Sequence, residues 1–322
     1  MPDNTHPLVT IAIPTYNRAD SYLKVALQCA IDQTYRHIEI IVSDNCSTDH
    51  TEKVVKSFPD NRIRYFKQAE NIGSNNNCNF CLEQARGEYF MLLFDDDVID
   101  RDFIEACVDA MPQNRKVGVI LTGAREIDEY GRTRGECQNR AKGSSIEEFF
   151  LDWFANNTPL YLCSTLYYTH GLREIGGFYS KTNRYQDVVA TAKLMAKYRR
   201  ADVPAVKAGF RRHSANLGSS VDITSWCEDS LYLLRVLCAL NPSANSLLER
   251  RGMAYFCKSN FRRASRIKHW PKRMMAYWAV SQRLNHSYSL TRFLYDKNIR
   301  PRVRACTRKM QQFIPGIWKP VG

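Results

Sequence analysis

The sequence predicts an α/β protein in which a doubly wound, mostly parallel sheet is followed by a basic region made only of helices. Two observations support this prediction. Over residues 8–211, short apolar runs rich in β-branched side chains alternate with helical patterns, which is the order expected of βαβ units. From residue 223 onward only helical periodicity remains.

The predicted strands are apolar along most of their length. A strand with one face in water would alternate apolar and polar side chains, so we expect these strands to be covered on both faces. The runs span residues 8–13, 38–43, 62–66, 88–94 and 117–121, and weaker extended stretches follow at 160–168 and 205–211.

Helical patterns separate the strands. Asp20 is the expected N-cap of the first helix, because apolar residues recur at i, i+3, i+4, i+7 and i+8 from position 23 onward. In a sheet of this kind ligands bind beyond the carboxyl ends of the strands, so polar residues directly after each strand are candidates for a site. Further helices are expected over 48–58, 74–86, 101–111, 146–154 and 186–199.

The charge of the chain is divided unevenly. The 322 residues carry a formal net charge of +13; residues 1–224 hold 27 Lys and Arg against 29 Asp and Glu, whereas residues 225–322 hold 19 against 4. We therefore expect an α/β domain over 1–224 and a basic helical region over 225–322. That region is predicted either to bind an anionic partner, a membrane surface or a nucleic acid, or to pack onto the first domain or a second subunit.

The composition excludes several classes of protein. With 44% hydrophobic and 25% charged residues and no low-complexity tract, the chain is globular rather than disordered or fibrous. No apolar run approaches the roughly 18 residues of a membrane span, and the N-terminus lacks a signal pattern. The 11 cysteines are scattered and odd in number, which favours reduced thiols. We expect a cytoplasmic protein.

Three polar clusters follow predicted strands. They are PTYNR at 14–18, DNCSTD at 44–49 and DDD at 95–97. Three consecutive carboxylates repel one another, and a hard cation such as Mg²⁺ or Mn²⁺ relieves that repulsion. The alternative for the third cluster is a solvated helix N-terminus, where aspartate is favoured by the helix dipole.

Taken in order, four strings resemble the inverting family 2 glycosyltransferases, which have the Rossmann-like GT-A fold of nucleotide-diphospho-sugar transferases. The strings are VTIAIPTYNR, IVSDNCSTD, NIGSNNN and GEYFMLLFDDDV. The resemblance covers roughly residues 8–215. It is to the members of the family that build bacterial surface glycans. It implies transfer of a sugar from a nucleotide diphosphate to a glycan or a lipid-linked saccharide.

The resemblance assigns the nucleotide to the loop that contains Pro14, Thr15, Tyr16 and Arg18. It implies that Tyr16 lies at the base or ribose and that Arg18 faces the diphosphate, which a planar guanidinium binds through two hydrogen bonds. Asp44 matches a family aspartate that accepts a hydrogen bond from the ring N–H of a pyrimidine. UDP or dTDP sugars are therefore the expected donors.

The resemblance also implies a metal site. Asp95 and Asp97 match the outer carboxylates of the family's D-x-D element, and because Asp96 lies between them the pair that binds stays open. We expect Asp95 and Asp96 at the nucleotide sugar and Asp97 on Mn²⁺ or Mg²⁺. His213 resembles a late family histidine that completes the metal site. Asn77, near a position where relatives often carry arginine, is expected at the nucleotide.

Asp187 is the candidate base. An inverting transfer needs one group that removes the proton from the acceptor hydroxyl, and the family carries a carboxylate at the start of a helix after a Gly-Gly-Phe segment. Here that segment is 176–178, and Gln186-Asp187 follows where relatives more often have Glu-Asp. The alternative is an aspartate that only stabilises the helix N-terminus.

Two other functions stay open. A sugar-nucleotide pyrophosphorylase on a similar fold would need a glycine-rich basic loop after the first strand, where this chain has PTYNR. A nucleic-acid-binding protein is favoured by the basic residues around Trp270 and opposed by the lack of a nucleic-acid motif.

The basic region offers a way to approach a lipid-linked acceptor. Lys and Arg near an anionic leaflet contribute about 1 kcal/mol each, and aromatic side chains anchor at the interface. We expect a peripheral protein on the cytoplasmic face of the inner membrane. The candidate anchors are Trp270, Trp278, Phe293, Tyr295, Phe313 and Trp318.

Overall fold

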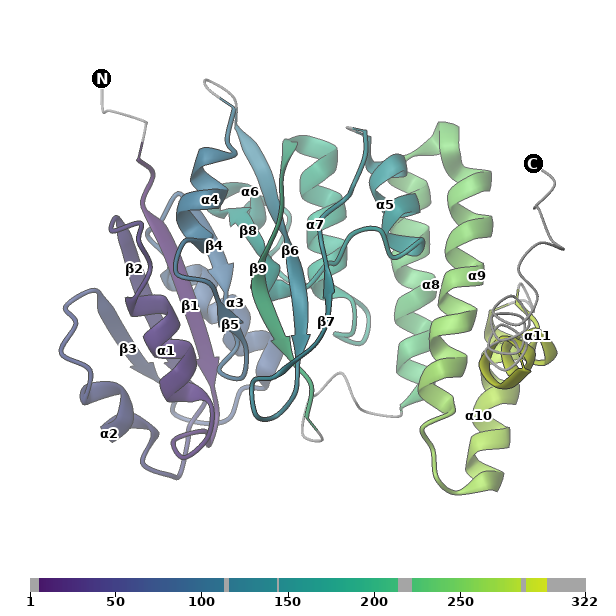
Figure 1. The fold of residues 1–322 in the computed structure, drawn as a ribbon, viewed down its shortest axis with the longest axis horizontal. Helices are drawn as coiled ribbons and strands as arrows, with labels where there is room; N and C mark the ends of the chain where they lie inside the picture. Colours follow the sequence, from purple (N-terminus) through teal and green to yellow (C-terminus); the bar gives the residue numbers. More distant parts are fainter. Residues whose placement is uncertain (1–5, 113–115, 144, 214–221, 285–287, 300–322) are drawn as a thin grey trace, which may run out of the picture.

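The computed structural model describes residues 6–112, 116–143, 145–213, 222–284 and 288–299. A large sheet has helices on both faces, and a group of longer helices lies beside it (Figure 1). The strands follow the order β3-β2-β1-β4-β8-β6-β9-β5, and β7 pairs with β6.

Four parallel strands form one half of the sheet. β1 pairs with β2 and β4, and β2 pairs with β3, all in parallel. β1, β2 and β4 are buried along their whole length, as their apolar sequences predict. The four strands are β1 (Val9–Thr15), β2 (Ile38–Asp44), β3 (Ile63–Lys67) and β4 (Tyr89–Leu92).

The other half of the sheet is mixed. β8 runs antiparallel to both β4 and β6, and β9 is parallel to β6, so β6 and β9 point the same way as β1. The mostly parallel, doubly wound sheet is thus confirmed, although β5 and β7 were not predicted. These strands are β5 (Val98–Ile99), β6 (Val117–Ile127), β7 (Thr133–Cys137), β8 (Thr165–Tyr168) and β9 (Arg199–Arg211).

Helices α1, α2 and α4 share one apolar cluster on one face of the sheet, and α3, α6 and α7 contribute to a second cluster on the other face. The predicted N-cap Asp20 is wrong: Tyr22 precedes α1 without a capping side-chain bond, and the Asp20 carboxylate instead lies 3.1 Å from the His50 ring. The helices are α1 (Leu23–Ile31), α2 (Thr51–Lys56), α3 (Ser74–Gln84), α4 (Phe103–Asp109), α5 (Ile146–Phe154), α6 (Thr169–Glu174) and α7 (Gln186–Lys197).

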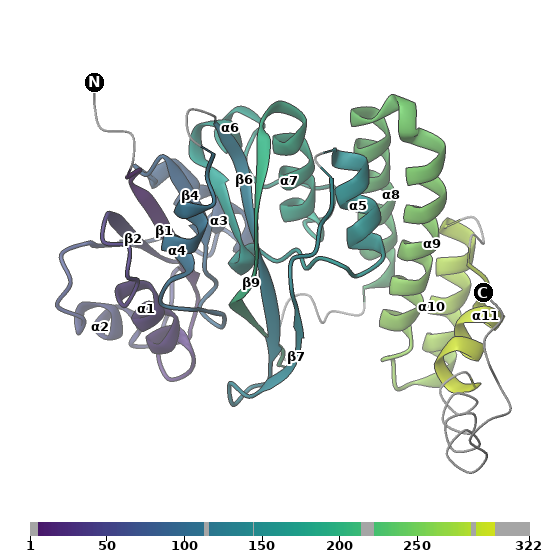
Figure 2. The ribbon, with the colours of Figure 1, turned by 45° about the horizontal axis from the view of Figure 1, so that its top comes forward.

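The C-terminal helices continue the second apolar cluster without a break. Side chains of α5, α7, α8 and α9 pack in it together, and Figure 2 shows α5 between α7 and these helices. No described helix is long and apolar enough to cross a bilayer. The helices are α8 (Ile223–Leu240), α9 (Asn245–Ala264), α10 (Trp270–Arg283) and α11 (Leu290–Leu294), with short helical turns η1 (Leu162–Ser164), η3 (Pro242–Ala244) and η4 (Tyr295–Ile299).

Candidate active site

The carboxyl ends of β1, β2 and β4 meet at one edge of the sheet. Thr15 at the end of β1 is the register partner of Asp44 at the end of β2. The Thr15 hydroxyl donates a 2.7 Å hydrogen bond to Asp95 Oδ2, just after β4. The parallel pairing therefore brings together the three polar clusters that the sequence places after these strands.

The end of β9 joins the Asp95–Asp97 turn. The backbone N–H of Arg211 donates to Asp97 Oδ1 at 2.9 Å, and Arg211 Nε donates to the carbonyl oxygen of Asp96 at 2.7 Å. His213 Nε2 lies 2.8 Å from Asp96 Oδ2. The predicted histidine thus lies beside the three carboxylates, with Asp96 as its partner.

The electrostatics of this turn fit a divalent cation. Burial raises the pKa of Asp95 to about 7. Burial, and then the negative charge of Asp96, raises the pKa of Asp97 well above its ordinary range. No described set of three or more His, Cys, Asp or Glu side chains forms a complete metal site. Mg²⁺ and Mn²⁺ commonly use one or two carboxylates together with substrate phosphates and water, so the residues present fit an ion shared with a substrate.

The loop after β1 is hydrogen-bonded to the loop after β2. Asn17 adopts a left-handed conformation with φ 53°; its N–H donates to Ser47 Oγ, and its Oδ1 accepts from the Thr48 N–H. Tyr16 is 43% exposed, and the charge of Arg18 acts on the Asp95 carboxyl. Tyr16 and Arg18 are therefore available at the rim of the site.

Asp44 and Asn77 lie deeper than the sequence suggests. The two carboxylate oxygens of Asp44 accept from the Ser47 N–H at 2.7 Å and the Tyr65 hydroxyl at 2.6 Å. The Asn77 amide accepts from the Ser43 hydroxyl at 2.6 Å and donates to the Ser43 carbonyl at 2.9 Å. In this arrangement both residues support the floor of the site, and Asp44 keeps lone pairs for one further donor.

Asp187 is the second residue of helix α7, and the residue as a whole is partly buried. Burial raises its pKa to about 6, with a further contribution from the negative charge of Asp229. The Gly-Gly-Phe segment before it is fixed to α3, because Asn79 accepts from the Phe178 N–H and donates to the Phe178 carbonyl. Gly177 has φ +72°, and a Cβ there would lie 2.4 Å from Asn79 Oδ1. This turn therefore requires glycine.

Asp229 on α8 is a residue that the sequence did not point to. It is fully buried, and its carboxylate accepts from the Ser180 hydroxyl at 2.6 Å and from the backbone N–H groups of Thr182, Arg184 and Tyr185 at 2.7, 2.6 and 3.1 Å. Four hydrogen bonds to one carboxylate hold the segment directly before Asp187. Asp229 therefore fixes the segment that precedes the candidate base.

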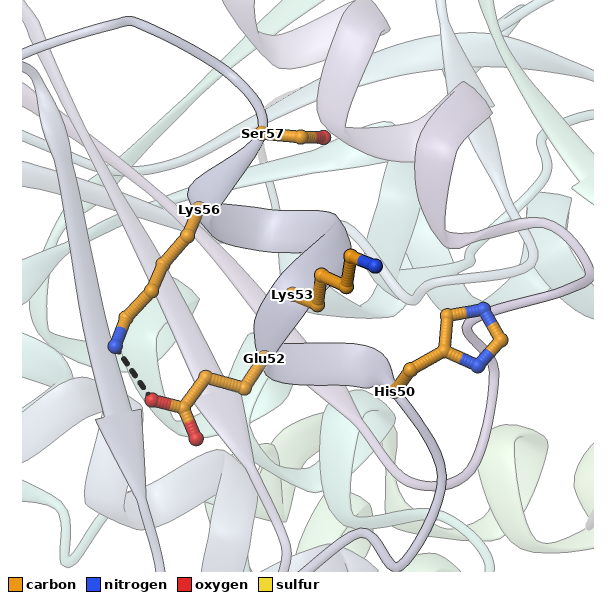
Figure 3. Close-up of a pocket in the computed structure, with 5 residues that line it drawn as sticks. All are labelled: His50, Glu52, Lys53, Lys56 and Ser57. Atoms are coloured by element: carbon orange, nitrogen blue, oxygen red, sulfur yellow. Dashed lines mark hydrogen bonds and ion pairs between the residues drawn. The ribbon is translucent and has the colours of Figure 1, made fainter.

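A separate hollow lies along α2. It has a volume of about 620 Å³ and is lined by His50, Glu52, Lys53, Lys56 and Ser57, with Lys56 paired to Glu52 (Figure 3). None of the predicted site residues lines it. Because its lining is basic and includes none of the carboxylates at the strand ends, we do not include it in the site.

The sheet and its clustered carboxylates define an α/β protein of the GT-A type. Residues 10–167 match the sequence profile of glycosyl transferase family 2, and we assign this part of the chain to that family. The match covers the strand ends, the Asp95–Asp97 turn and α3. It favours the glycosyltransferase prediction over the pyrophosphorylase and nucleic-acid alternatives.

Curated relatives match the same part of the chain. An uncharacterized glycosyltransferase of Rickettsia conorii is 41% identical over 131 residues, which are 40% of this chain and 21% of that protein. The chondroitin synthase of Escherichia coli is 32% identical over 127 residues, 39% of this chain and 18% of that protein. The chain thus spans about a fifth of the length of these two relatives.

Solved structures match most of the chain. TarS 1-349 of S. aureus in complex with UDP-GlcNAc has a TM-score of 0.59 at 16% identity, covering 90% of this chain and 91% of that one. The mannosyltransferase PcManGT of Pyrobaculum calidifontis in complex with GDP-Man and Mn²⁺ has a TM-score of 0.54 at 19% identity, covering 96% and 82%. These likenesses show the fold.

Proposed function

We propose that the protein is an inverting glycosyltransferase that moves a sugar from a nucleotide diphosphate to a hydroxyl group of a saccharide acceptor. The observation that carries this proposal is the meeting of the Asp95–Asp97 turn with Thr15 at one edge of the sheet, in a family 2 domain. The donor would lie at this edge, with Tyr16 and Arg18 at its rim.

UDP or dTDP sugars are the proposed donors. Arg18 would face the diphosphate, and Asp44 would accept a hydrogen bond from the pyrimidine N–H with a lone pair that Ser47 and Tyr65 leave available. Two structural neighbours were solved with different donors, UDP-GlcNAc and GDP-Man. The nucleotide that this chain prefers therefore has to be measured.

Asp97 and His213 would hold Mn²⁺ or Mg²⁺. When bound, the ion would neutralise charge that develops on the departing diphosphate. A neighbour of the same fold was solved with Mn²⁺. Burial and the charge of Asp96 raise the pKa of Asp97, so a cation beside this carboxylate would stabilise its ionised form.

Asp187 would act as the base. With a pKa of about 6 its carboxyl group is mostly ionised at pH 7, and it remains basic enough to take the proton of the acceptor hydroxyl as that oxygen attacks the anomeric carbon. The diphosphate leaves from the opposite face of the sugar. The first turn of α7 and the Asp229 hydrogen bonds keep the carboxylate in a fixed place.

The test of this proposal is a screen of nucleotide sugars for protection against thermal unfolding, with and without Mn²⁺. A ligand that binds only the native state raises the midpoint of unfolding. We expect UDP or dTDP sugars to raise it when Mn²⁺ is present. If no nucleotide sugar protects the chain under either condition, the proposal is wrong.

A peripheral place at an anionic membrane is a second proposal, and the exposed side of α10 favours it. Trp270 and Trp278 are 68% and 65% exposed, and Met274 and Met275 are exposed between them. We call these four residues the α10 ridge. Lys268 and Lys272 are exposed next to it, so the helix combines interfacial aromatics with positive charge.

The predicted anchors do not all share this exposure. Phe293 is 4% exposed and packs in the core, so its prediction as an anchor is wrong, while Tyr295 is 47% exposed. Phe313 and Trp318 lie outside the described residues. Within the described residues, the proposal of a membrane surface therefore rests on the α10 ridge and Tyr295.

A further inference from the structure

Arg211, the last residue of β9, is buried although it is an arginine, with only 4% of its surface exposed. It joins β9 to the Asp95–Asp97 turn by two hydrogen bonds. Its backbone N–H donates to Asp97 Oδ1 at 2.9 Å, and its Nε donates to the carbonyl oxygen of Asp96 at 2.7 Å. The turn is thus fixed to β9 at two successive residues.

The far end of the guanidinium reaches the turn between β6 and β7. Arg211 Nη1 donates to the carbonyl oxygens of Asp128 and Glu129 at 3.0 and 3.4 Å. That turn is closed by the Asp128 carboxylate, whose Oδ1 accepts from the backbone N–H groups of Tyr130 and Arg132 at 3.0 and 2.9 Å. One side chain therefore ties the turn after β4 to a second turn that has hydrogen bonds of its own.

Tyr22, directly before α1, closes these contacts into a ring. The guanidinium carbon of Arg211 lies 4.4 Å from the centre of the Tyr22 ring, and the centre of the His213 ring lies 5.4 Å from the same point. His213 Nε2 in turn lies 2.8 Å from Asp96 Oδ2. The predicted metal histidine is therefore held between Tyr22 and Asp96. We call Arg211 and Tyr22 the brace.

The hydrogen bonds described for the Arg211 side chain go to backbone oxygens. A guanidinium donates in a rigid, planar fork, so these bonds fix the path of the backbone through Asp96. They do so without using the carboxylate oxygens of Asp96 and Asp97, which are the kind of oxygen that a divalent cation binds. The Arg211 side chain is thus suited to hold the turn in place and to leave its carboxylates to a ligand.

We propose that Arg211 and Tyr22 are positioning residues for metal-dependent binding of the donor, because they keep Asp96, Asp97 and His213 in the arrangement that receives the cation. Arg211 would act through the backbone of the turn, and Tyr22 through the His213 ring. The inference rests on the proposed function and adds two residues to it. Groups that orient metal ligands change metal affinity by about 10–100-fold when they are replaced.

The test uses the full chain and four substitutions in the brace. R211Q removes the charge and the fork. R211K keeps the charge, but a single ammonium nitrogen cannot reach Asp96 and the β6–β7 turn together. Y22L removes the aromatic ring, and Y22F keeps it. Because Tyr22 is only partly buried, Y22L tests the proposal even if the Arg211 variants fail to fold.

R62Q is the matched control. Arg62 is also partly buried, with 21% of its side chain exposed, and it too donates to a backbone carbonyl, that of Ile31 at 3.0 Å. It directly precedes β3, so it lies at the amino end of that strand and not at the carboxyl ends that carry the site. Its loss should lower stability and leave the Asp95–Asp97 turn unchanged.

Calorimetry gives the UDP affinity in Mn²⁺ and in EDTA, and urea unfolding gives the stability of each variant. We expect UDP affinity in Mn²⁺ to fall about 10–100-fold in R211Q, R211K and Y22L, and to stay within about twofold of the parent in Y22F and R62Q. In EDTA every variant should match the parent, because the brace acts through the metal site.

The proposal is overturned if R211Q and Y22L keep the parent UDP affinity in Mn²⁺, if R62Q loses as much as R211Q, or if the loss is equally large in EDTA. Parent-like affinity in R211K would also overturn it, since charge alone would then suffice. Failure of the parent to bind UDP would instead count against the proposed function. A parent that binds UDP equally well in Mn²⁺ and in EDTA would overturn the metal site and this inference with it.

Discussion

The carboxylate of Asp229 on helix α8 accepts a 3.1 Å hydrogen bond from the backbone N–H of Tyr185, two residues before Asp187. The C-terminal helices are thus bonded to the segment that presents the candidate base. Apolar side chains of α7 and α8 also pack in the same cluster. Both Asp187 and Asp229 lie outside residues 10–167, which match family 2.

Replacing Asp229 by Asn should impair transfer through Asp187. The amide keeps the size of the side chain but loses charge-assisted bonds to four donors, so we expect stability to fall by about 2–4 kcal/mol and kcat to fall more than the affinity for UDP. The negative charge of Asp229 raises the pKa of Asp187. Its removal should therefore shift the acidic limb of the kcat profile to lower pH.

Glu228→Gln is the control for this prediction, because it removes the same charge from the neighbouring, partly exposed position. It should leave both the profile and kcat close to those of the parent. A variant D229N that loses stability but keeps the parent pH profile would show that Asp229 has only a structural role.

Asp187→Asn should separate donor binding from transfer. The amide keeps the shape of the carboxylate but cannot take a proton, so we expect transfer to fall roughly 10²–10⁴-fold while UDP affinity stays nearly unchanged. Transfer by the parent should decline as pH falls through about 6, since the folded-state pKa of Asp187 is raised to that value and only the ionised carboxylate is a base. Asp109→Asn, on the exposed side of α4, is the charge control. Parent-like turnover in D187N would place the base elsewhere.

Much of this site could be predicted because its parts are local in sequence. Strands such as Val9–Thr15 are too apolar to have a face in water, so their burial could be predicted. The polar residues that follow them meet because parallel strands end at the same edge of the sheet.

The parts that were missed depend on contacts distant in sequence. Asp229 bonds to residues more than 40 positions away, and an aspartate within a helical pattern is ordinarily solvated. The sequence held one indication of burial. Asp229 lies four residues before Leu233, and residues four apart share one face of a helix. β7 (Thr133–Cys137) is mostly exposed and polar, so it has no apolar pattern to detect. The partner of His213, Asp96, lies 117 residues away, and only the family resemblance pointed to that histidine.

Asp97→Asn should weaken metal-dependent donor binding. The substitution removes one negative charge from a site where burial and Asp96 already raise the pKa of this carboxyl, so a divalent cation would lose a ligand. We expect UDP affinity in Mn²⁺ to fall at least tenfold and to equal the value of the parent in EDTA. Asp109→Asn serves again as the control. Calorimetry that shows parent UDP affinity unchanged by EDTA would remove the metal from the proposed function.

Binding to anionic vesicles tests the role of the α10 ridge. Two exposed tryptophans beside exposed lysines should hold the chain at a bilayer that contains anionic lipid, and the attraction should weaken steeply with salt because charges are screened over about 8–10 Å. Removing residues 260–322 would also remove Phe261 and Ala264 from the core. The double variant W270S/W278S therefore gives the cleaner experiment, since both side chains lie largely in solvent.

In co-sedimentation we expect the parent to bind vesicles with anionic lipid at low salt and to be released as salt rises, and W270S/W278S to bind at least fivefold less. Tyr130→Ser is the matched control, because Tyr130 is 73% exposed on the turn between β6 and β7, away from α10. An equal loss of vesicle binding in the control would indicate non-specific binding by exposed aromatic side chains. If the parent does not bind anionic vesicles even at low salt, the membrane proposal fails. The ridge is then better explained as a contact between copies of the chain. Sedimentation velocity of the parent and of W270S/W278S would show such a contact as a difference in oligomeric state.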